Sequence, residues 1–359
     1  MFLSTSYNPS AAARAISIAC SLLVTSVFAS VAIAQDDNAF DRILDRDRLI
    51  CGVSTGVPGF SEKDEKGRYS GFDVDFCRAV AAAMLGDDSK VDYEELDSSE
   101  RFDALISRRV DVLFRNTTWT FTRDIEKLID FAAINYYDGQ GFLVKADSEI
   151  GSVADLNARS FCVQRNTTTD MNLTDYVQER DWDIERLYFD TLDEAIAAYL
   201  KGDCDSLTAD GSALAGLRST FEDRSAHRLL PNNVSKEPLA LAVRQGDEQL
   251  RDVVAWTVYA MIAAEELGIN QKNVDEIRNN SRKGAHRRLL GQPTDGTDSI
   301  SLGYLLNLED DWAYKVIRLV GNYGDVFENN LGPGTSVNLP RGRNALYTDG
   351  GLMYSPPFR

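Results

Sequence analysis

The sequence predicts an α/β fold in two lobes that are joined by two extended hinge strands. Strand-like and helix-like patterns alternate between residues 48 and 114, and the same alternation starts again between residues 160 and 230. Such alternation is typical of a largely parallel sheet covered by helices. Two further extended segments, 139–144 and 233–243, flank the second run. We therefore expect these two segments to pair and to connect the lobes.

The first lobe begins with five elements whose type follows from the spacing of apolar residues. Short apolar or alternating runs predict strands, and apolar residues three or four positions apart predict helices. In chain order these elements are a strand over 48–55, a helix over 71–85, a strand over 91–96, a helix over 99–109 and a strand over 110–114. Asp73 and Ser99 are residue types that cap helix N-termini, so we expect them to begin the two helices.

The second lobe repeats the pattern, and the chain then returns to the first. Strands are expected over 160–164, 184–189, 204–209 and 227–230, and helices over 168–180, 191–202 and 211–221. A strand over 238–247 and a helix over 252–268 follow, and further helical patterns occupy 301–307 and 309–332. We thus predict lobe 1 over 35–142 and 237–268, lobe 2 over 143–236, and a C-terminal extension over 269–359 that packs on lobe 1.

The first 34 residues are predicted to be a cleaved secretory signal peptide. Arg14 precedes an apolar run over 15–34, which ends in Ala-Ile-Ala before Gln35. A positive start, an apolar stretch and a small-residue cleavage site are the three parts of such a peptide. The alternative is a membrane anchor, since about 20 apolar residues can span a bilayer. The small residues at the end favour cleavage, and we expect export to the periplasm of a Gram-negative bacterium.

The composition excludes one class of partner and predicts disulfides. The chain has 56 acidic and 38 basic residues and a formal net charge of −18. Polyanions repel such a protein, so we expect no nucleic-acid partner. Beyond the leader, an even number of cysteines in an oxidising compartment predicts disulfides. These cysteines are Cys51, Cys77, Cys162 and Cys204.

Four cysteines allow three pairings, and nearness in the sequence favours one of them. We expect Cys51 to pair with Cys77 in lobe 1, and Cys162 with Cys204 in lobe 2. The spacing C-x-x-C does not occur, and the two histidines of the chain are far apart in the sequence. The sequence therefore predicts no zinc site and no cofactor.

A polar segment directly after the strand 110–114 predicts a binding site. Asn116, Thr117 and Thr118 run into Trp119, and Arg123 follows in the first turn of a short helix that Thr120 is expected to cap. Ligands of α/β proteins bind at the carboxyl ends of strands. A helix N-terminus and a guanidinium both suit a carboxylate. The alternative is that Arg123 forms an ion pair on the surface.

The second lobe repeats this arrangement. Thr167 and Thr168 stand between a strand and a helix, where their hydroxyl and backbone N–H groups can meet the same anion. Asp210 ends the strand 204–209 and is suited to an ammonium group. The alternative for Thr167 and for Asp210 is an ordinary N-cap, although capping and binding are compatible for Thr167.

The motifs GVSTGVPGF, SGFDVDFCRAV, VDVLFRNTTWTFTRD, DFA, VQRNTTTD and DSLTADGSAL occur in this order. In this order they resemble the periplasmic binding proteins of polar amino-acid ABC transporters, and among these the general L-amino-acid-binding type. The resemblance covers about residues 40–270 and, more loosely, the extension. It implies a bilobed type II periplasmic-binding-protein fold and a monomer without enzymatic activity. The implied partners are a small L-amino acid and an inner-membrane ABC permease.

The resemblance also implies roles for individual residues. Arg123 would hold the α-carboxylate of the ligand and Asp210 its α-ammonium. Polar contacts to the ligand would come from four residues, which are Asn116, Thr118, Thr167 and Thr168. Phe60 would form an aromatic wall over the ligand, with Trp119 as a second candidate for that wall.

Two positions depart from the pattern of the family. Relatives that select cationic side chains have an acid near the position of Ser54, so strict selectivity for such ligands is not expected. Arg115 stands where relatives often have a small residue. It would pair either with an acidic side chain of the ligand or with a neighbouring aspartate.

Two other classes of function remain as alternatives. An enzyme on the same bilobed fold, such as a cyclohexadienyl-type dehydratase, would need a general acid or base in the cleft, for which Glu237 and Asp210 are candidates. The sequence has no Ser-His-Asp order and no metal-ligand cluster, which favours a binding protein. An exported interaction module would instead use the C-terminal extension as its contact surface.

Overall fold

The computed structural model describes Met1 and residues 38–231, 233–293 and 301–359. Apart from Met1, the predicted signal peptide lies outside these described residues. From Asn38 onward the described residues form one compact unit. None of its helices combines the length and the apolar character needed to cross a membrane.

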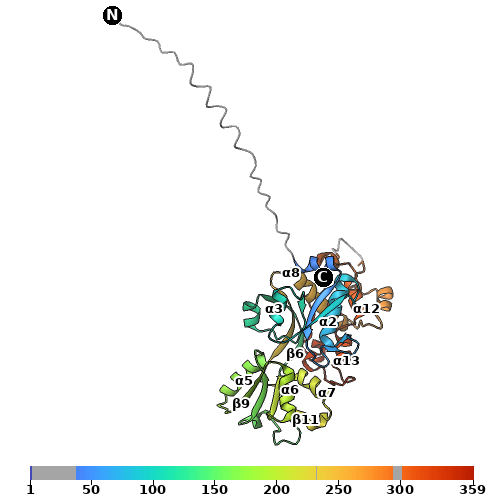
Figure 1. The fold of residues 1–359 in the computed structure, drawn as a ribbon. Helices are drawn as coiled ribbons and strands as arrows, with labels where there is room; N and C mark the ends of the chain where they lie inside the picture. The colour runs from blue at the N-terminus through green and yellow to red at the C-terminus, as the bar shows by residue number, and fades with distance from the viewer. Residues whose placement is uncertain (2–37, 232, 294–300) are drawn as a thin grey trace. The chain divides into compact units, whose positions relative to one another are not determined.

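The first lobe is built on a five-stranded sheet with the order β4-β1-β5-β12-β6 (Figure 1). β1 is parallel to β4 and β5, whereas β12 is antiparallel to β5 and β6. The strands are β1 (Leu49–Ser54), β4 (Val91–Leu96), β5 (Val112–Leu113), β6 (Ile129–Asp138) and β12 (Glu237–Arg244). The carboxyl ends of β4, β1 and β5 therefore lie at one edge of the sheet, where a ligand site is expected.

The second lobe contains another five-stranded sheet, with the order β11-β7-β10-β8-β9. β8 is parallel to β9 and β10, and β7 is antiparallel to β10 and β11. The strands are β7 (Gln140–Lys145), β8 (Ser160–Gln164), β9 (Glu185–Phe189), β10 (Ser206–Asp210) and β11 (His227–Leu229). The two separate sheets confirm the predicted division of the fold into two α/β lobes.

Two neighbouring segments carry the chain between the sheets. β6 runs through Gly139 into β7, and β12 begins beside it, with Glu237 paired to Asp138. Figure 1 shows β6 at the boundary between the two lobes. A Cβ atom on Gly139 would lie 2.7 Å from the carbonyl oxygen of Ser235, so the two segments approach too closely for a side chain there. Two extended segments thus join the lobes as the sequence predicts, but the strands that pair are β6 and β12. Most of 139–144 instead lies in β7 of the lobe 2 sheet, and it meets 233–243 through the hydrogen bond from Val234 to the carbonyl of Gln140.

Helices of lobe 1 and of the C-terminal extension enclose one apolar core. α2 packs against α8 and α12, and its run of alanines allows the close approach. Tyr323 of the extension is fully buried, contacts Phe72 edge to face, and donates its hydroxyl to the carbonyl of Asn135 at 2.9 Å. The helices are α1 (Ala39–Arg46), α2 (Phe72–Leu85), α3 (Arg101–Ile106), α4 (Phe121–Glu126), α8 (Glu248–Glu266), α9 (Val274–Asn280), α10 (Gly284–Leu289), α11 (Leu302–Leu305), α12 (Trp312–Leu319) and α13 (Tyr323–Asn330).

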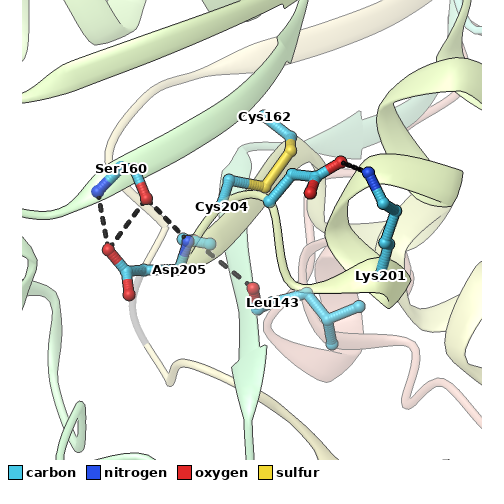
Figure 2. Close-up of a disulfide and its surroundings, with 8 residues drawn as sticks. Leu143, Ser160, Cys162, Lys201, Cys204 and Asp205 are labelled. Carbon is cyan, nitrogen blue, oxygen red and sulfur yellow. Dashed lines mark hydrogen bonds and ion pairs between the residues drawn. A yellow bond between two sulfur atoms is a disulfide. The ribbon is translucent and has the colours of Figure 1, made fainter.

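Lobe 2 carries three helices and one of two disulfides. The helices are α5 (Thr168–Gln178), α6 (Leu192–Lys201) and α7 (Gly211–Thr220). Cys162 is joined to Cys204 with a Cα–Cα distance of 5.8 Å, and Cys51 is joined to Cys77 at 6.2 Å. Figure 2 shows the lobe 2 disulfide beside hydrogen bonds between Ser160 and Asp205. Both favoured pairings are thus present, one in each lobe.

Short elements complete the chain. They are the hairpin strands β2 (Glu62–Lys63) and β3 (Tyr69–Ser70), and the 3-10 turns η1 (Val153–Leu156), η2 (Arg224–Ala226), η3 (Gly342–Asn344) and η4 (Tyr347–Asp349).

Three sequence-based expectations need correction. Gly71, not Asp73, is the N-cap of α2, because Asp73 is buried in the first turn and accepts a hydrogen bond from Asn135 at 3.1 Å. Ser99 does not cap α3, since its hydroxyl donates to Asp97. The helical pattern over 309–332 is broken before α13, because Gly321 has a φ of 116°.

Candidate functional site

A cleft that is partly open to solvent is lined by residues of both lobes. Lobe 1 contributes polar residues from the carboxyl edge of its sheet, and lobe 2 contributes the start of α5 and the end of β10. The polar lining residues of lobe 1 are Ser54, Ser98, Arg101, Arg115, Asn116, Thr118 and Arg123, and those of lobe 2 are Gln164, Thr167, Thr168, Thr169, Thr208 and Asp210. The apolar residues of the lining are Val57, Leu192, Ala209 and Ala213.

Arg123 is held with its charge toward the cleft. Thr120 caps α4 by accepting the backbone N–H of Arg123, as the sequence predicts. The guanidinium donates one hydrogen bond to the carbonyl of Thr118 at 2.9 Å. Burial lowers the pKa of Arg123, and the carboxylates of Glu237 and Asp210 oppose this effect only in part. Within the described part of the chain Arg123 makes no ion pair, so its charge is available to a ligand.

Asp210 lies across the cleft at the end of β10. It occupies the N-cap position of α7, yet its side chain accepts no capping hydrogen bond. Burial raises the pKa of Asp210 well above its ordinary value, and the nearby carboxylates of Asp138 and Glu237 raise it further. The side chain has no hydrogen-bond or ion-pair partner among the described residues. An ammonium group would supply the missing positive charge.

The polar loop before Arg123 places unpartnered groups in the cleft. Asn116 has a φ of 40°, a left-handed conformation that asparagine tolerates better than most residues. Its buried side-chain oxygen and nitrogen have no partner in the described part of the chain. These two atoms can therefore accept from and donate to a polar ligand.

Threonines of the two lobes meet across the cleft. The hydroxyl oxygens of Thr118 and Thr168 are 3.3 Å apart. Thr167 is the N-cap of α5, where it accepts the N–H of Asp170 and donates to the carbonyl of Gln164 at 2.8 Å. Thr168 is the first residue of α5, so the free N–H groups of this helix start beside the cleft.

Two further carboxylates belong to the hinge. Asp138 accepts hydrogen bonds from Gly139 and from both the backbone and the hydroxyl of Ser212. Burial raises the pKa of Asp138 to about 6. Glu237 accepts from Thr118 at 2.6 Å, from Ser235 and from Asn172. Since Glu237 is fully engaged at the hinge and does not line the cleft, it is poorly placed to act as an acid or base there.

The structure does not bring the two proposed aromatic residues into the cleft. Phe60 is completely buried in the core of lobe 1, where its ring meets those of Phe72 and Tyr136 edge to face. Trp119 stacks on Phe131 with ring centroids 5.3 Å apart. The expectation of an aromatic wall over the ligand therefore needs correction, because Phe60 is enclosed by the core and neither Phe60 nor the partly buried Trp119 is among the residues that line the cleft.

Arg101 is the main cleft residue that sequence reasoning missed. It lies in the first turn of α3, where the helical pattern drew attention to the inward apolar residues that follow it. The side chain is 3% exposed and contacts the ring of Phe102, with Cζ 4.9 Å from the ring centroid. No local pattern marks Arg101 as a cleft residue, because by position it is an ordinary first-turn residue of a helix.

Comparison with known proteins places the chain in a family. Residues 49–274 match the family model described as bacterial extracellular solute-binding proteins, family 3. The general L-amino acid-binding periplasmic protein AapJ of Rhizobium johnstonii is 47% identical, over 86% of this chain and 89% of that protein. The glutamate/glutamine/aspartate/asparagine-binding protein BztA of Rhodobacter capsulatus is 45% identical, over 92% of this chain and 96% of that protein.

A solved structure agrees with these sequence matches. It is an ABC transporter periplasmic binding protein from Brucella ovis with glutathione bound. It superposes with a TM-score of 0.86 at 45% identity and covers 90% of this chain and 99% of that one. The chain therefore belongs to the bacterial extracellular solute-binding proteins of family 3.

Proposed function

We propose that this protein is a periplasmic receptor that captures L-amino acids, with polar or acidic side chains among its ligands, and delivers them to an ABC permease. The observation that carries the proposal is the pairing of Arg123 and Asp210. They come from opposite lobes, line one cleft, and have no ion-pair partner among the described residues. An amino acid presents one carboxylate and one ammonium, which match these two charges.

The same arrangement explains how binding would close the hinge. Removing both charges of a zwitterion from water costs several kcal/mol unless each meets a partner. Only the closed form offers partners from both lobes at once, so the ligand binds that form more tightly. A shift from mostly open to mostly closed needs a differential affinity of roughly 5.5 kcal/mol. The closed form would then be the one that the permease recognises.

The names of the relatives support this class of ligand. AapJ is named for general L-amino acids and BztA for glutamate, glutamine, aspartate and asparagine. The Brucella ovis structure holds glutathione, which makes a small peptide with a free glutamate end a second candidate ligand. No observation on this chain favours an enzyme on the same fold.

We further propose a cellular location for the protein and residue boundaries for its two lobes. The location would be the periplasm, a word that the name of AapJ contains. Residues 1–34 would be removed as a signal peptide, and the exported chain would act as a monomer. Lobe 1 would comprise 35–142 and 237–268, lobe 2 would comprise 143–236, and 269–359 would belong with lobe 1. The buried contacts of Tyr323 with lobe 1 support the last assignment.

A thermal-shift screen tests the proposed function. The exported protein, freed of bound ligand by unfolding and refolding with its disulfides intact, is heated with each common L-amino acid and with glutathione. A ligand that binds only the native form raises the melting temperature, and one present at 100 times its dissociation constant stabilises by about 2.7 kcal/mol. We expect a rise for glutamate and glutamine. No shift with any of these compounds would refute an amino-acid receptor.

A further inference from the structure

The cleft contains more positive charge than one amino-acid backbone can use. Three arginines line it, at positions 101, 115 and 123, whereas Asp210 is the one acidic residue in its described lining. In the proposed function Arg123 meets the α-carboxylate and Asp210 the α-ammonium. Two guanidinium groups then remain without an assigned counter-charge.

We propose that Arg101 and Arg115, together with Ser54, form a second anion subsite that takes a carboxylate on the side chain of the ligand. The inference rests on the proposed function and gives it a preferred ligand class, the dicarboxylic amino acids. It assigns Arg115 to the ligand rather than to a neighbouring aspartate.

Arg101 is the residue that most strongly indicates a missing partner. Its side chain is 3% exposed, and its buried Nε has no hydrogen-bond acceptor in the described part of the chain. It also makes no ion pair there. A buried guanidinium group that lacks an acceptor for its Nε–H loses hydration, and the contact with the ring of Phe102 does not replace that hydrogen bond, which a ligand carboxylate would supply.

Arg115 and Ser54 place further donors at the same edge of the sheet. Arg115 lies two residues after the end of β5, is 9% exposed, and is anchored by a hydrogen bond of 2.8 Å from its Nε to the carbonyl of Leu96. Ser54 ends β1, the strand between β4 and β5, and its buried hydroxyl has no partner among the described residues. Arg101 follows β4. Residues 97–100 separate Arg101 from the end of β4, so the three residues lie at or beyond the carboxyl ends of three adjacent strands.

The charges of the arginines in the cleft act against one another, as the direction of their pKa shifts indicates. Burial lowers the pKa of Arg101 well below its ordinary value, and the charges of Arg115 and Arg123 lower it further. Burial lowers the pKa of Arg115 to about 10. Asp97 and Asp210, and for Arg115 also the buried Asp73, oppose these effects only in part. A ligand with a second carboxylate would reduce the repulsion, whereas a neutral side chain would leave it.

Pairs of ligands with nearly the same shape test the contribution of the second subsite apart from that of the rest of the site. Glutamate and glutamine differ by the charge of one group, as do aspartate and asparagine. Calorimetry on the exported protein with its disulfides intact gives the dissociation constants of all four for the wild type, Arg101→Met and Arg115→Met. Arg109→Met is the matched control, because Arg109 is surface-exposed and pairs with Glu94 and Glu100 outside the cleft.

We expect Arg101→Met to weaken glutamate binding about 100-fold and glutamine binding less than about fivefold, as for the loss of a buried charge pair. Arg115→Met should also weaken glutamate binding more than glutamine binding. Arg109→Met should leave the ratio of the two dissociation constants unchanged. In the ligand-free protein, Arg101→Met should melt at the same or a higher temperature, because an unpaired buried charge is removed. A structural role for Arg101 would lower that temperature instead.

Other outcomes would overturn the inference. If Arg101→Met weakens the binding of glutamate and of glutamine equally, or weakens neither, then Arg101 does not bind a second carboxylate. If Arg101→Met fails to fold, Arg101→Lys keeps the charge without the planar fork and should still weaken glutamate more than glutamine. Wild-type protein that binds none of these four ligands would also overturn the inference, whereas the proposed function itself is refuted only if none of the common L-amino acids and glutathione binds.

Discussion

Thr118 and Thr168 come from different lobes, and their hydroxyl oxygens lie 3.3 Å apart across the cleft. Thr118 also donates to Glu237 of the hinge at 2.6 Å, and Glu237 accepts from Asn172 of lobe 2. A second contact between the lobes joins Ser98 to Gln164 at 3.5 Å. The structure therefore represents a closed arrangement in which cleft and hinge share one hydrogen-bond network.

This network predicts that Thr118→Val weakens ligand binding without removing it. Valine keeps the shape of threonine but leaves Glu237 with one donor fewer, which costs about 1–3 kcal/mol. We expect the affinity for glutamate, measured by calorimetry, to fall about tenfold or more. Thr220→Val is a suitable control, because Thr220 donates to its own helix at Leu217, far along α7 from the cleft. Unchanged affinity of Thr118→Val would show that the hydrogen bond from Thr118 to Glu237 at the hinge does not contribute to ligand binding.

The raised pKa of Asp210 predicts that ligand binding releases protons. An ammonium beside Asp210 favours its ionised form, whereas in the empty cleft burial and the carboxylates of Asp138 and Glu237 favour the protonated form. Affinity for glutamine should therefore rise with pH until the pKa of free Asp210 is passed. Calorimetry at one pH in buffers of different ionisation enthalpy counts the released protons. Uptake of protons on binding would contradict this account.

The hinge aspartate predicts the pH dependence of stability in the ligand-free protein. Burial raises the pKa of Asp138 from 3.8 to about 6, so between these values the native state binds more protons than the unfolded state. The contribution of Asp138 to stability is then largest below pH 3.8 and is lost as the pH rises toward 6 and above. Urea unfolding of the wild type and of Asp138→Asn at about pH 5 and pH 7.5 gives the difference in their free energies of unfolding, which isolates the contribution of Asp138. We expect the wild type to lose stability relative to the variant at the higher pH.

The burial of Tyr323 against lobe 1 predicts that the C-terminal extension contributes to the stability of the fold. Its ring is completely buried against Phe72, and its hydroxyl is bonded to Asn135. Tyr323→Phe should cost about 1 kcal/mol for the lost hydrogen bond, and Tyr323→Ala about 3–5 kcal/mol for the cavity. Urea unfolding followed by tryptophan fluorescence measures both. A loss below about 1 kcal/mol for Tyr323→Ala would mean that the extension packs loosely.

Local patterns identified much of the fold and part of the site. Strands and helices of both lobes follow from apolar periodicity, and the nearness of Cys51 to Cys77 and of Cys162 to Cys204 indicated the disulfide pairing. Arg123 and Asp210 were found because each stands at the carboxyl end of a predicted strand, where a ligand is expected.

The remaining features depend on contacts between segments distant in the sequence. Phe60 has the residue type of a binding-site wall, but Phe72 and Tyr136 enclose it in the core. Asp73 has the residue type of an N-cap, but Asn135, 62 positions away, pairs with it. Arg101 has the position of an ordinary helix residue, and its role depends on the charges that the sheet order gathers around it. Such tertiary contacts leave no local signal in a single sequence.

Calorimetry of Arg123→Ala with glutamate and glutamine tests the central claim most directly. Arg123 is expected to hold the carboxylate that both ligands share, so its removal should weaken both by about 1,000-fold or more, as for a buried charge left without its partner. Arg109→Ala, at the surface, should bind both ligands like the wild type. An Arg123→Ala variant that binds glutamate and glutamine with wild-type affinity would contradict the account.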